Sequence, residues 1–219
     1  MAQKRTQQFL VWSVLIITTF IALFPMYWLF VNSLTPMIGT PPLTPILIPA
    51  FSLDNFARLL GGTRNYTDWM RNSLTVSIVV TLWHIVFDTM AGYAFAKRQF
   101  PLKNVMFWII LSTLMIPVQV TLIPLYVVAR QFGLIDNLLS LILPGTAAAF
   151  GIFLMRQYIQ TLPTELEDAA RIDGAGEFRV FWEIILPMCK PAIAALAIFT
   201  FVRNWNDFLW PVIALNRPQ

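Results

Sequence analysis

Long apolar runs, separated by short polar segments, set the pattern of this chain. Each run continues for about 20 residues without the alternation of a strand, which is the length that an α-helix needs to cross the hydrocarbon core of a bilayer. The sequence therefore predicts five membrane-spanning helices, at about 9–31, 74–96, 105–128, 137–155 and 191–215. Pro117 and Pro124 remove backbone donors from the third span, so we expect it to be kinked or divided.

Basic residues orient these spans. Lys4 and Arg5 precede the first span, and Lys97, Arg98 and Lys103 separate the second from the third. Because basic residues favour the cytoplasmic side, we expect the N-terminus inside, an external loop at 32–73 and a cytoplasmic loop at 159–190. The external loop is rich in proline and should hold at most one short helix, near 54–60. Residues 1–219 should form a single transmembrane domain.

The composition fits a membrane protein and excludes several functions. With 58% hydrophobic and 12% charged residues, the chain has too little polar surface for a soluble globule. The net charge of +4 follows from the topology, and no basic run with interleaved aromatic residues indicates nucleic-acid binding. One histidine and one cysteine cannot build a usual zinc site. The phosphate-binding pattern GxxxxGK[ST] is absent from the sequence, so we expect no cofactor and no catalysis in this chain.

The most charged segment, Thr161–Pro187, holds eight charged residues between two apolar runs. Thr164 and Glu167 have the spacing of a capping box, so a helix should begin near Thr164. Glu167 and Arg171 lie four residues apart in the favourable order for an ion pair. The segment must lie in water while its flanks lie in lipid, which makes it a point of contact for a soluble partner.

One face of this helix carries Leu166, Ala169 and Ala170 and is small enough for another surface to approach closely. Asp173 and Gly174 should end the helix. A second helix should follow from Glu177 and end at Pro187. Its expected core-facing stripe consists of Phe178, Phe181, Trp182 and Ile185.

At these residues the chain resembles the inner-membrane permease subunits of ABC importers. Their signature is Glu-Ala-Ala, three residues, Gly, nine residues, then Ile-x-Leu-Pro. Asp168-Ala169-Ala170, Gly174 and Ile184-Ile185-Leu186-Pro187 fall at that spacing, with Asp in place of Glu. Asp173-Gly174-Ala175 is similar to the form found in carbohydrate importers such as the maltose and glycerol-3-phosphate permeases.

The resemblance implies an all-α integral membrane fold, the helical bundle of type I ABC importer permeases. It also implies that the cytoplasmic loop transmits the motion of an ATPase. The coupling residues that it indicates are Glu167, Asp168, Ala169, Ala170, Asp173, Gly174, Ala175, Phe178, Leu186 and Pro187. An amphipathic loop lying on the lipid headgroups is the alternative interpretation.

Two polar pairs interrupt the predicted spans. His84 and Asp88 lie four residues apart in the second span, as do Arg203 and Asp207 in the fifth, so each pair should share a helix face. Ionisable groups inside a membrane are costly and are functional candidates. Asn204-Trp205-Asn206-Asp207-Phe208 also resembles a motif of sugar-type permeases. We assign all seven polar and aromatic positions to a translocation path: His84, Asp88, Arg203, Asn204, Trp205, Asn206 and Asp207. The alternative is structural bonding between helices, which we favour for His84.

The implied function is the permease subunit of an ATP-driven importer for a sugar, polyol or sugar-like solute in the bacterial inner membrane. The implied partners are a second permease subunit, two ATPase subunits that bind ATP-Mg, and an external solute-binding protein. A secondary transporter or channel subunit is the competing class. Permeases of this type continue into a sixth helix, so we also expect a further span of about 20 residues beyond Gln219.

Overall fold

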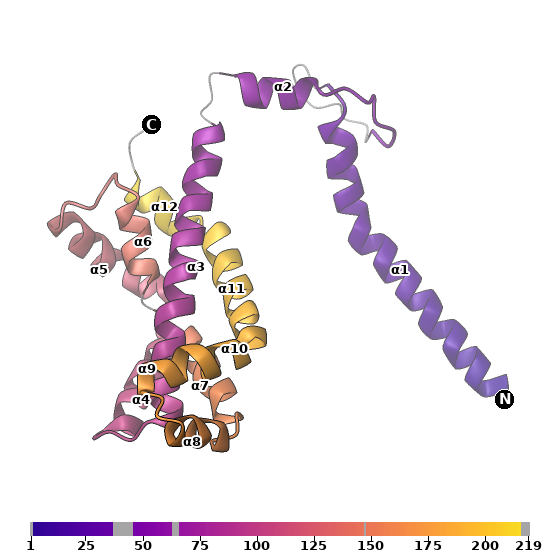
Figure 1. The fold of residues 1–219 in the computed structure, drawn as a ribbon. Coiled ribbons are helices and arrows are strands. Elements are labelled where there is room, and N and C mark those ends of the chain that lie inside the picture. Colours follow the sequence, from indigo (N-terminus) through magenta and orange to yellow (C-terminus); the bar gives the residue numbers. More distant parts are fainter. Residues whose placement is uncertain (1, 37–45, 63–65, 147, 216–219) are drawn as a thin grey trace. The chain divides into compact units, whose positions relative to one another are not determined.

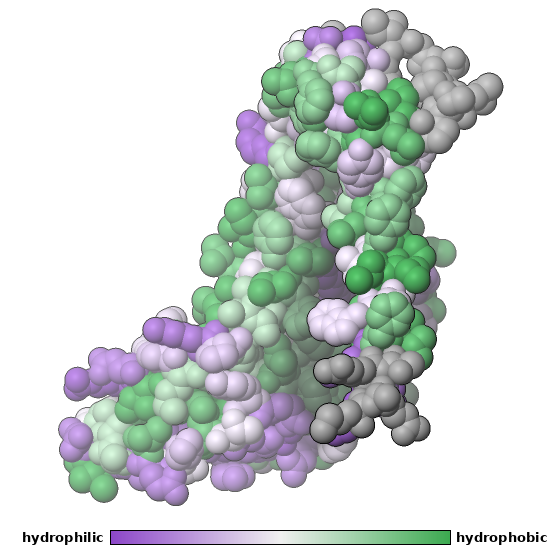
Figure 2. Space-filling view, turned by 90° about the vertical axis from the view of Figure 1, so that its right-hand side faces the viewer, coloured by the Kyte–Doolittle hydropathy of each residue, from purple (hydrophilic) through white to green (hydrophobic). Residues whose placement is uncertain are grey.

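A computed structural model describes residues 2–36, 46–62, 66–146 and 148–215. Helices are the only regular elements in these ranges (Figure 1), as the apolar runs predict. The chain forms two compact units, 1–68 and 69–219. Three helical stretches, Gln7–Ser33, Tyr66–Lys97 and Leu139–Gln160, are long and apolar enough to cross a membrane, and each of two bent helix pairs could form one more span. Figure 2 shows hydrophobic residues over most of the visible face and hydrophilic residues mainly toward its lower end.

The first unit contains α1 (Ala2–Ser33) and α2 (Asp54–Gly61), close to the predicted span and surface helix. Asn55 joins them, because its side-chain nitrogen donates to the carbonyls of Asn32 at 3.3 Å, Ser33 at 3.1 Å and Thr35 at 2.7 Å. The last carbonyls of a helix have no intrahelical donor. The amide of Asn55 therefore satisfies the C-terminal end of α1. Residues 37–45 and 63–65 of the predicted external loop lie outside the described ranges.

The long helix α3 (Tyr66–Lys97) is the second predicted span, and it begins eight residues earlier than the apolar run indicates. Two glycines allow it to approach α7 (Ala149–Gln160) closely. A Cβ atom at Gly92 would lie 2.6 Å from Cβ of Met155, and one at Gly151 would lie 1.7 Å from Oδ2 of Asp88. At each of these two contacts, the glycine of one helix leaves the space that a residue of the other helix occupies.

The third span is divided, as its prolines predict. It comprises α4 (Lys103–Ser112), a 3₁₀ turn η1 (Thr113–Met115) and α5 (Val118–Gln131), with a bend of 101° at the break before Val118. The fourth comprises α6 (Leu139–Gly145) and α7, which continues to Gln160 rather than ending at Met155. Apolar content ends near Met155, but the helix extends into the polar residues that follow it.

The predicted fifth span, at about 191–215, is interrupted in the structure. The helix α11 (Lys190–Trp205) ends, and a separate α12 (Leu209–Ala214) follows. Pro211 has no N–H to donate to the carbonyl of Asp207, so a continuous helix would leave that carbonyl unpaired. The side chain of Asn206 also donates to the carbonyl of Val202 at 2.8 Å. Local hydrogen bonding of this kind competes with helix continuation.

After the break, α12 packs against α5 and α6. Trp210 and Ala214 form a buried cluster with Ala129, and the indole N–H of Trp210 donates to the carbonyl of Ser140 at 2.8 Å. The backbone N–H of Asp136 donates to the carbonyl of Ala214 at 2.9 Å. These contacts fix α12 beside α6 (Figure 1). The end of the predicted fifth span therefore packs on the helices of the third and fourth predicted spans.

The predicted cytoplasmic loop contains α8 (Glu165–Ile172), α9 (Glu177–Arg179), a π-helical segment η2 (Val180–Ile185) and α10 (Leu186–Met188). The π geometry shifts the face that follows Arg179. Phe181 and Ile185 are buried as expected, but Phe178 and Trp182 are exposed, and Val180 is buried in their place. The predicted stripe is therefore wrong in two of its four positions, because it assumed an α-helical period.

A buried cluster lies under this loop. Its members come from α3, α7, η2, the turn before α11 and α11 itself, and are Tyr93, Met155, Ile159, Val180, Phe181, Ile185, Cys189, Ala192 and Leu196. Burial raises the pKa of the Cys189 thiol, which lies at the joint before α11, to about 11. The thiol is therefore protonated at neutral pH and unreactive.

Candidate functional sites

A buried carboxylate holds α8 against the end of α3. Glu167 is 1% exposed, and its Oε2 accepts hydrogen bonds from Arg98 at 3.1 Å, from Arg171 at 3.1 Å and from the hydroxyl of Tyr93 at 3.2 Å. Its Oε1 has no hydrogen-bond partner but lies 3.9 Å from Nζ of Lys97. Two guanidinium groups thus compensate a charge that would be costly to bury alone.

The capping-box prediction is wrong, although α8 does begin next to Thr164. Thr164 has helical backbone angles, and its side chain makes no capping bond. Its hydroxyl instead accepts from Nζ of Lys97 at 3.1 Å, and the same Nζ donates to the carbonyl of Leu162 at 2.6 Å. Neither side chain is therefore available for a capping box. Lys97 of α3 binds Thr164, and Arg98 and Arg171 bind Glu167.

The other side of α8 faces outward. Leu166, Asp168, Ala169 and Ile172 are exposed, with Ile172 86% exposed, while Ala170 packs on the buried cluster. Ala170 therefore does not share the open face predicted for it. Of the remaining proposed coupling residues, the exposed ones are Asp173, Gly174, Phe178 and Pro187, and those packed against the cluster are Ala175 and Leu186.

Gly174 ends α8 as predicted. It has φ of +82°, and its N–H donates to the carbonyl of Arg171 at 3.0 Å. The N–H of Ala175 donates to the carbonyl of Ala170 at 2.9 Å. These two hydrogen bonds are those of a Schellman cap. The cap needs a residue with left-handed backbone angles, which glycine adopts without strain.

His84 and Asp88 form the predicted pair inside the bundle. Nδ1 of His84 lies 2.6 Å from Oδ2 of Asp88, and Nε2 of His84 lies 2.8 Å from the carbonyl oxygen of Gly145. Both side chains are buried, at 3% and 4% exposed. The imidazole thus connects α3 to the last residue of α6, as the structural interpretation expects.

The second predicted pair does not form. Because α11 ends at Trp205, Asp207 lies beyond the helix, and no ion pair joins it to Arg203 within the described ranges. Both residues line a cavity of about 490 Å³ together with His84 and Asn204. The structure thus brings most of the proposed path residues together, but around a cavity and not on one helix face.

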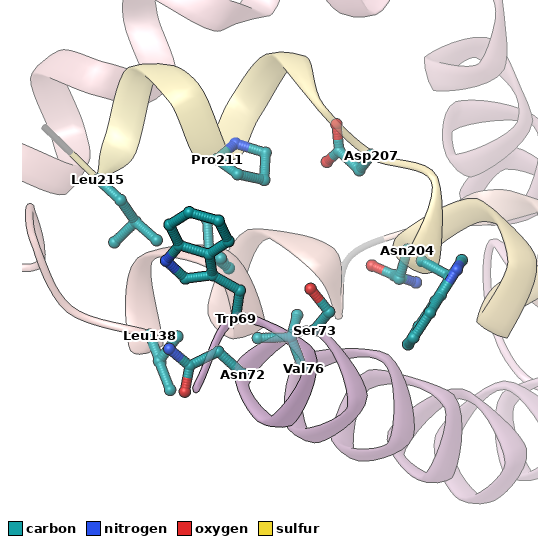
Figure 3. Close-up of a pocket in the computed structure, with 11 residues that line it drawn as sticks. Trp69, Asn72, Ser73, Val76, Leu138, Asn204, Asp207, Pro211 and Leu215 are labelled. Atoms are coloured by element: carbon teal, nitrogen blue, oxygen red, sulfur yellow. The ribbon is translucent and has the colours of Figure 1, made fainter. Parts of the chain in front are cut away.

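A second cavity, of about 330 Å³, lies between the start of α3 and the turn from α11 to α12. Trp69, Asn72 and Ser73 line it from α3, and Figure 3 shows them across from Asn204 and Asp207. Trp205 also lines this cavity. Neither cavity is lined by Asn206 or Asp88.

The sequence analysis does not single out Trp69, Asn72 and Ser73, which line the smaller cavity from α3. A polar stripe at spacings of three and four leads from Ser73, which lines the smaller cavity, to the His84–Asp88 pair. Its members are Ser73, Ser77, Thr81, His84 and Asp88. The hydroxyls of Ser77 and Thr81 are buried, and neither has a hydrogen-bond partner. Small hydroxyl residues are common in membrane helices, so such a stripe in an apolar run does not by itself indicate a site.

Comparison with known proteins places these features in a family. The family of binding-protein-dependent transport system inner membrane components matches residues 88–218. The chain belongs to this family. The matched residues include α8, its glycine cap and the turn after α11.

Two permeases of known systems are similar to this chain over most of its length. The arabinooligosaccharides transport system permease protein of Halalkalibacterium halodurans is 36% identical over 98% of this chain and 79% of its own. The sn-glycerol-3-phosphate transport system permease protein of Yersinia pestis is 39% identical over 91% of this chain and 73% of its own. The chain is thus a permease subunit of the ABC importer class, and the secondary-transporter alternative is not favoured.

A solved structure has the same fold. A chain of a bacterial ABC transporter involved in the import of the acidic polysaccharide alginate matches 99% of this permease and 77% of its own length, with a TM-score of 0.88 and 25% identity. The expectation of a type I importer permease bundle is confirmed. By its family, the chain is an inner membrane component of a binding-protein-dependent transport system.

Proposed function

We propose that this permease imports a sugar, polyol or sugar-like solute and that α8 couples it to a cytoplasmic ATPase subunit. The observation that carries the coupling role is the two-sided environment of α8. Glu167 ties one side to α3, while Leu166, Ala169 and Ile172 on the other side are open. Apolar side chains exposed in a charged, water-facing loop indicate a protein partner.

The charge of this surface argues against the headgroup alternative. Six acidic residues and two arginines lie in Thr161–Pro187. Asp168 and Glu177, which pair with Arg171, have side chains 61% exposed, and Glu165 and Asp173 are exposed as well. Anionic lipids of the inner leaflet repel such an acidic surface. A protein groove with basic residues is the better complement.

The assembly and topology follow from this role. The permease pairs with a second permease subunit, two ATPase subunits supply ATP-Mg chemistry, and an external binding protein delivers the solute. The N-terminus lies inside, so that α8 and its basic neighbours Lys97 and Arg98 face the cytoplasm. Movement of the docked ATPase displaces α8, and the Glu167 contacts transmit that displacement to α3.

A substitution on the open face of α8 tests the coupling role. Ala169→Arg puts a long charged side chain on a surface that must be approached closely, whereas Ala169→Ser preserves its size. In the assembled importer, we expect Ala169→Arg to lose co-purification with the ATPase subunits and ATP-dependent solute uptake, with the permease still present in the membrane. Ala169→Ser should retain both. Retention of the ATPase and of uptake by the Arg variant would contradict the docking of α8.

A further inference from the structure

The cavity of about 330 Å³ has the residue types of a carbohydrate site. This volume is near the lower end of the range of about 300–1,000 Å³ typical of small-molecule sites. Trp69 and Trp205 line it with indole rings, one from α3 and one from the end of α11. Flat aromatic rings suit the apolar C–H faces of a sugar ring, while their N–H groups remain available to polar atoms.

Its polar groups complement hydroxyls. Asn72 and Ser73 come from α3, and Asn204 and Asp207 come from the other wall (Figure 3). Amide and hydroxyl side chains both donate and accept, as sugar hydroxyls do, whereas an ionised carboxylate only accepts. The set therefore suits a ligand that can donate to Asp207.

Charge is the discriminating feature. Asp207 is the one charged residue among the described residues that line this cavity. Asp207 lines both cavities, whereas Arg203 lines only the neighbouring one. An anionic solute would therefore meet a carboxylate here without a compensating cation, and two like charges repel strongly at contact distance.

The position of the cavity makes it an entry site. Trp69 lies near the start of α3 and Lys97 at its end. They are 28 positions apart in the helix, which separates them by roughly 42 Å. Lys97 contacts the loop that carries α8. The cavity is therefore at the end of the bundle opposite the proposed ATPase surface.

We propose that this cavity binds one neutral, hydroxylated unit of the solute on the external side and that Asp207 excludes anionic solutes. This inference rests on the proposed import function, which it narrows to neutral sugars or polyols. Asp207 acts by charge selection, Trp69 and Trp205 hold the ring, and Asn72 and Asn204 bond its hydroxyls.

Direct binding to the purified importer complex in nanodiscs, without the external binding protein, tests the inference. The probes are glucose, arabinose, glucuronate and glycerol 3-phosphate, titrated against intrinsic tryptophan fluorescence and by calorimetry. We expect the wild type to bind the neutral sugars more tightly than the two anions. Asp207→Asn should improve anion binding roughly tenfold while neutral binding changes little. Asp207→Glu, which keeps the charge, should behave as the wild type.

Trp69→Ala provides a second arm and should weaken neutral-sugar binding, with no change in the ratio of neutral to anionic affinity. Equal binding of glucose and glucuronate by the wild type, or an unchanged ratio in Asp207→Asn, would overturn the inference. ATP-dependent uptake is measured on the same preparations with the binding protein added. If ATP-dependent uptake persists but Asp207→Asn leaves the ratio of neutral to anionic affinity unchanged, the assignment of this cavity is wrong and the import function still stands. If no ATP-dependent uptake occurs, the import function itself fails.

Discussion

His84 and Asp88 lie one helical turn apart on α3, and their side chains meet at 2.6 Å while the imidazole also reaches the carbonyl of Gly145 at 2.8 Å. Gly145 is the last residue of α6, where a carbonyl has no intrahelical donor. The pair therefore joins α3 to the interrupted fourth span. It also accounts for two ionisable groups in an apolar helix, since each compensates the other.

Breaking this pair on one side should cost more than removing it entirely. His84→Leu leaves the carboxylate of Asp88 buried without a partner, and we expect it to lower the free energy of unfolding by about 3–5 kcal/mol. The double variant His84→Leu, Asp88→Leu should be less damaged, because no unpaired charge remains. Thermal unfolding of the purified permease and a double-mutant cycle measure both effects. A double variant less stable than His84→Leu would show that the pair is not mutually compensating.

The approach of α3 to α7 leaves no room at Gly92. A Cβ there would lie 2.6 Å from Cβ of Met155 and 2.9 Å from the backbone nitrogen of Arg156, so the helices must separate. We expect Gly92→Ala to destabilise the permease by about 1–3 kcal/mol, measured as a lower midpoint of thermal unfolding. The control is Gly61→Ala, where nothing lies within 4 Å of the added atom. Equal midpoints for the two variants would contradict the close approach.

Gly174 and Gly176 offer a matched pair at the joint after α8. Both have open space around them, but Gly174 has φ of +82° and Gly176 has φ of −72°. Gly174→Asp strains the Schellman cap and turns the end of α8, so we expect it to abolish uptake while the permease stays in the membrane. Gly176→Asp adds the same charge without the strain and should retain most uptake. Normal uptake by Gly174→Asp would remove the joint from the coupling mechanism.

Glu167 should matter more than its neighbour Glu165. Glu167→Gln removes the charge that two guanidinium groups surround, and we expect a loss of about 3 kcal/mol or more in stability with weaker ATP-dependent uptake. The exposed Glu165→Gln should change stability by less than about 0.5 kcal/mol. Chemical unfolding of the two purified variants makes the comparison. Similar values for both would mean that α8 is not held through this carboxylate.

Asn204 and Asn206 separate the two interpretations of the polar motif. Each amide donates to the carbonyl four residues before it, but Asn204 lines both cavities and Asn206 lines neither. We expect Asn204→Leu to lower uptake or alter solute preference, and Asn206→Leu to have the smaller effect on transport. Uptake kinetics across a panel of sugars provide the measurement. If both variants transport as well as the parent, the motif is structural.

The α8 segment shows how far local pattern reaches. The start of α8 next to Thr164, its end at Gly174 and the ion pair of Glu167 with Arg171 depend on neighbouring residues, and all three were predicted correctly. The capping box is wrong because Lys97 binds Thr164, 67 residues away, and Arg98 binds Glu167, 69 residues away. The stripe after Glu177 was wrong because the backbone adopts π geometry, which changes the period.

The sequence by itself determined the class of this protein. Apolar runs of bilayer length, prolines that divide the third span, and the spacing from Asp168 to Pro187 all depend on order along the chain, and the family match agrees with them. Only the tertiary structure decided where the polar groups gather. Asp207 lines a cavity with Trp69 and Asn72, more than 130 residues before it, because α11 breaks and α12 packs on α6. Packing between distant segments sets such a cavity, and no local spacing encodes it.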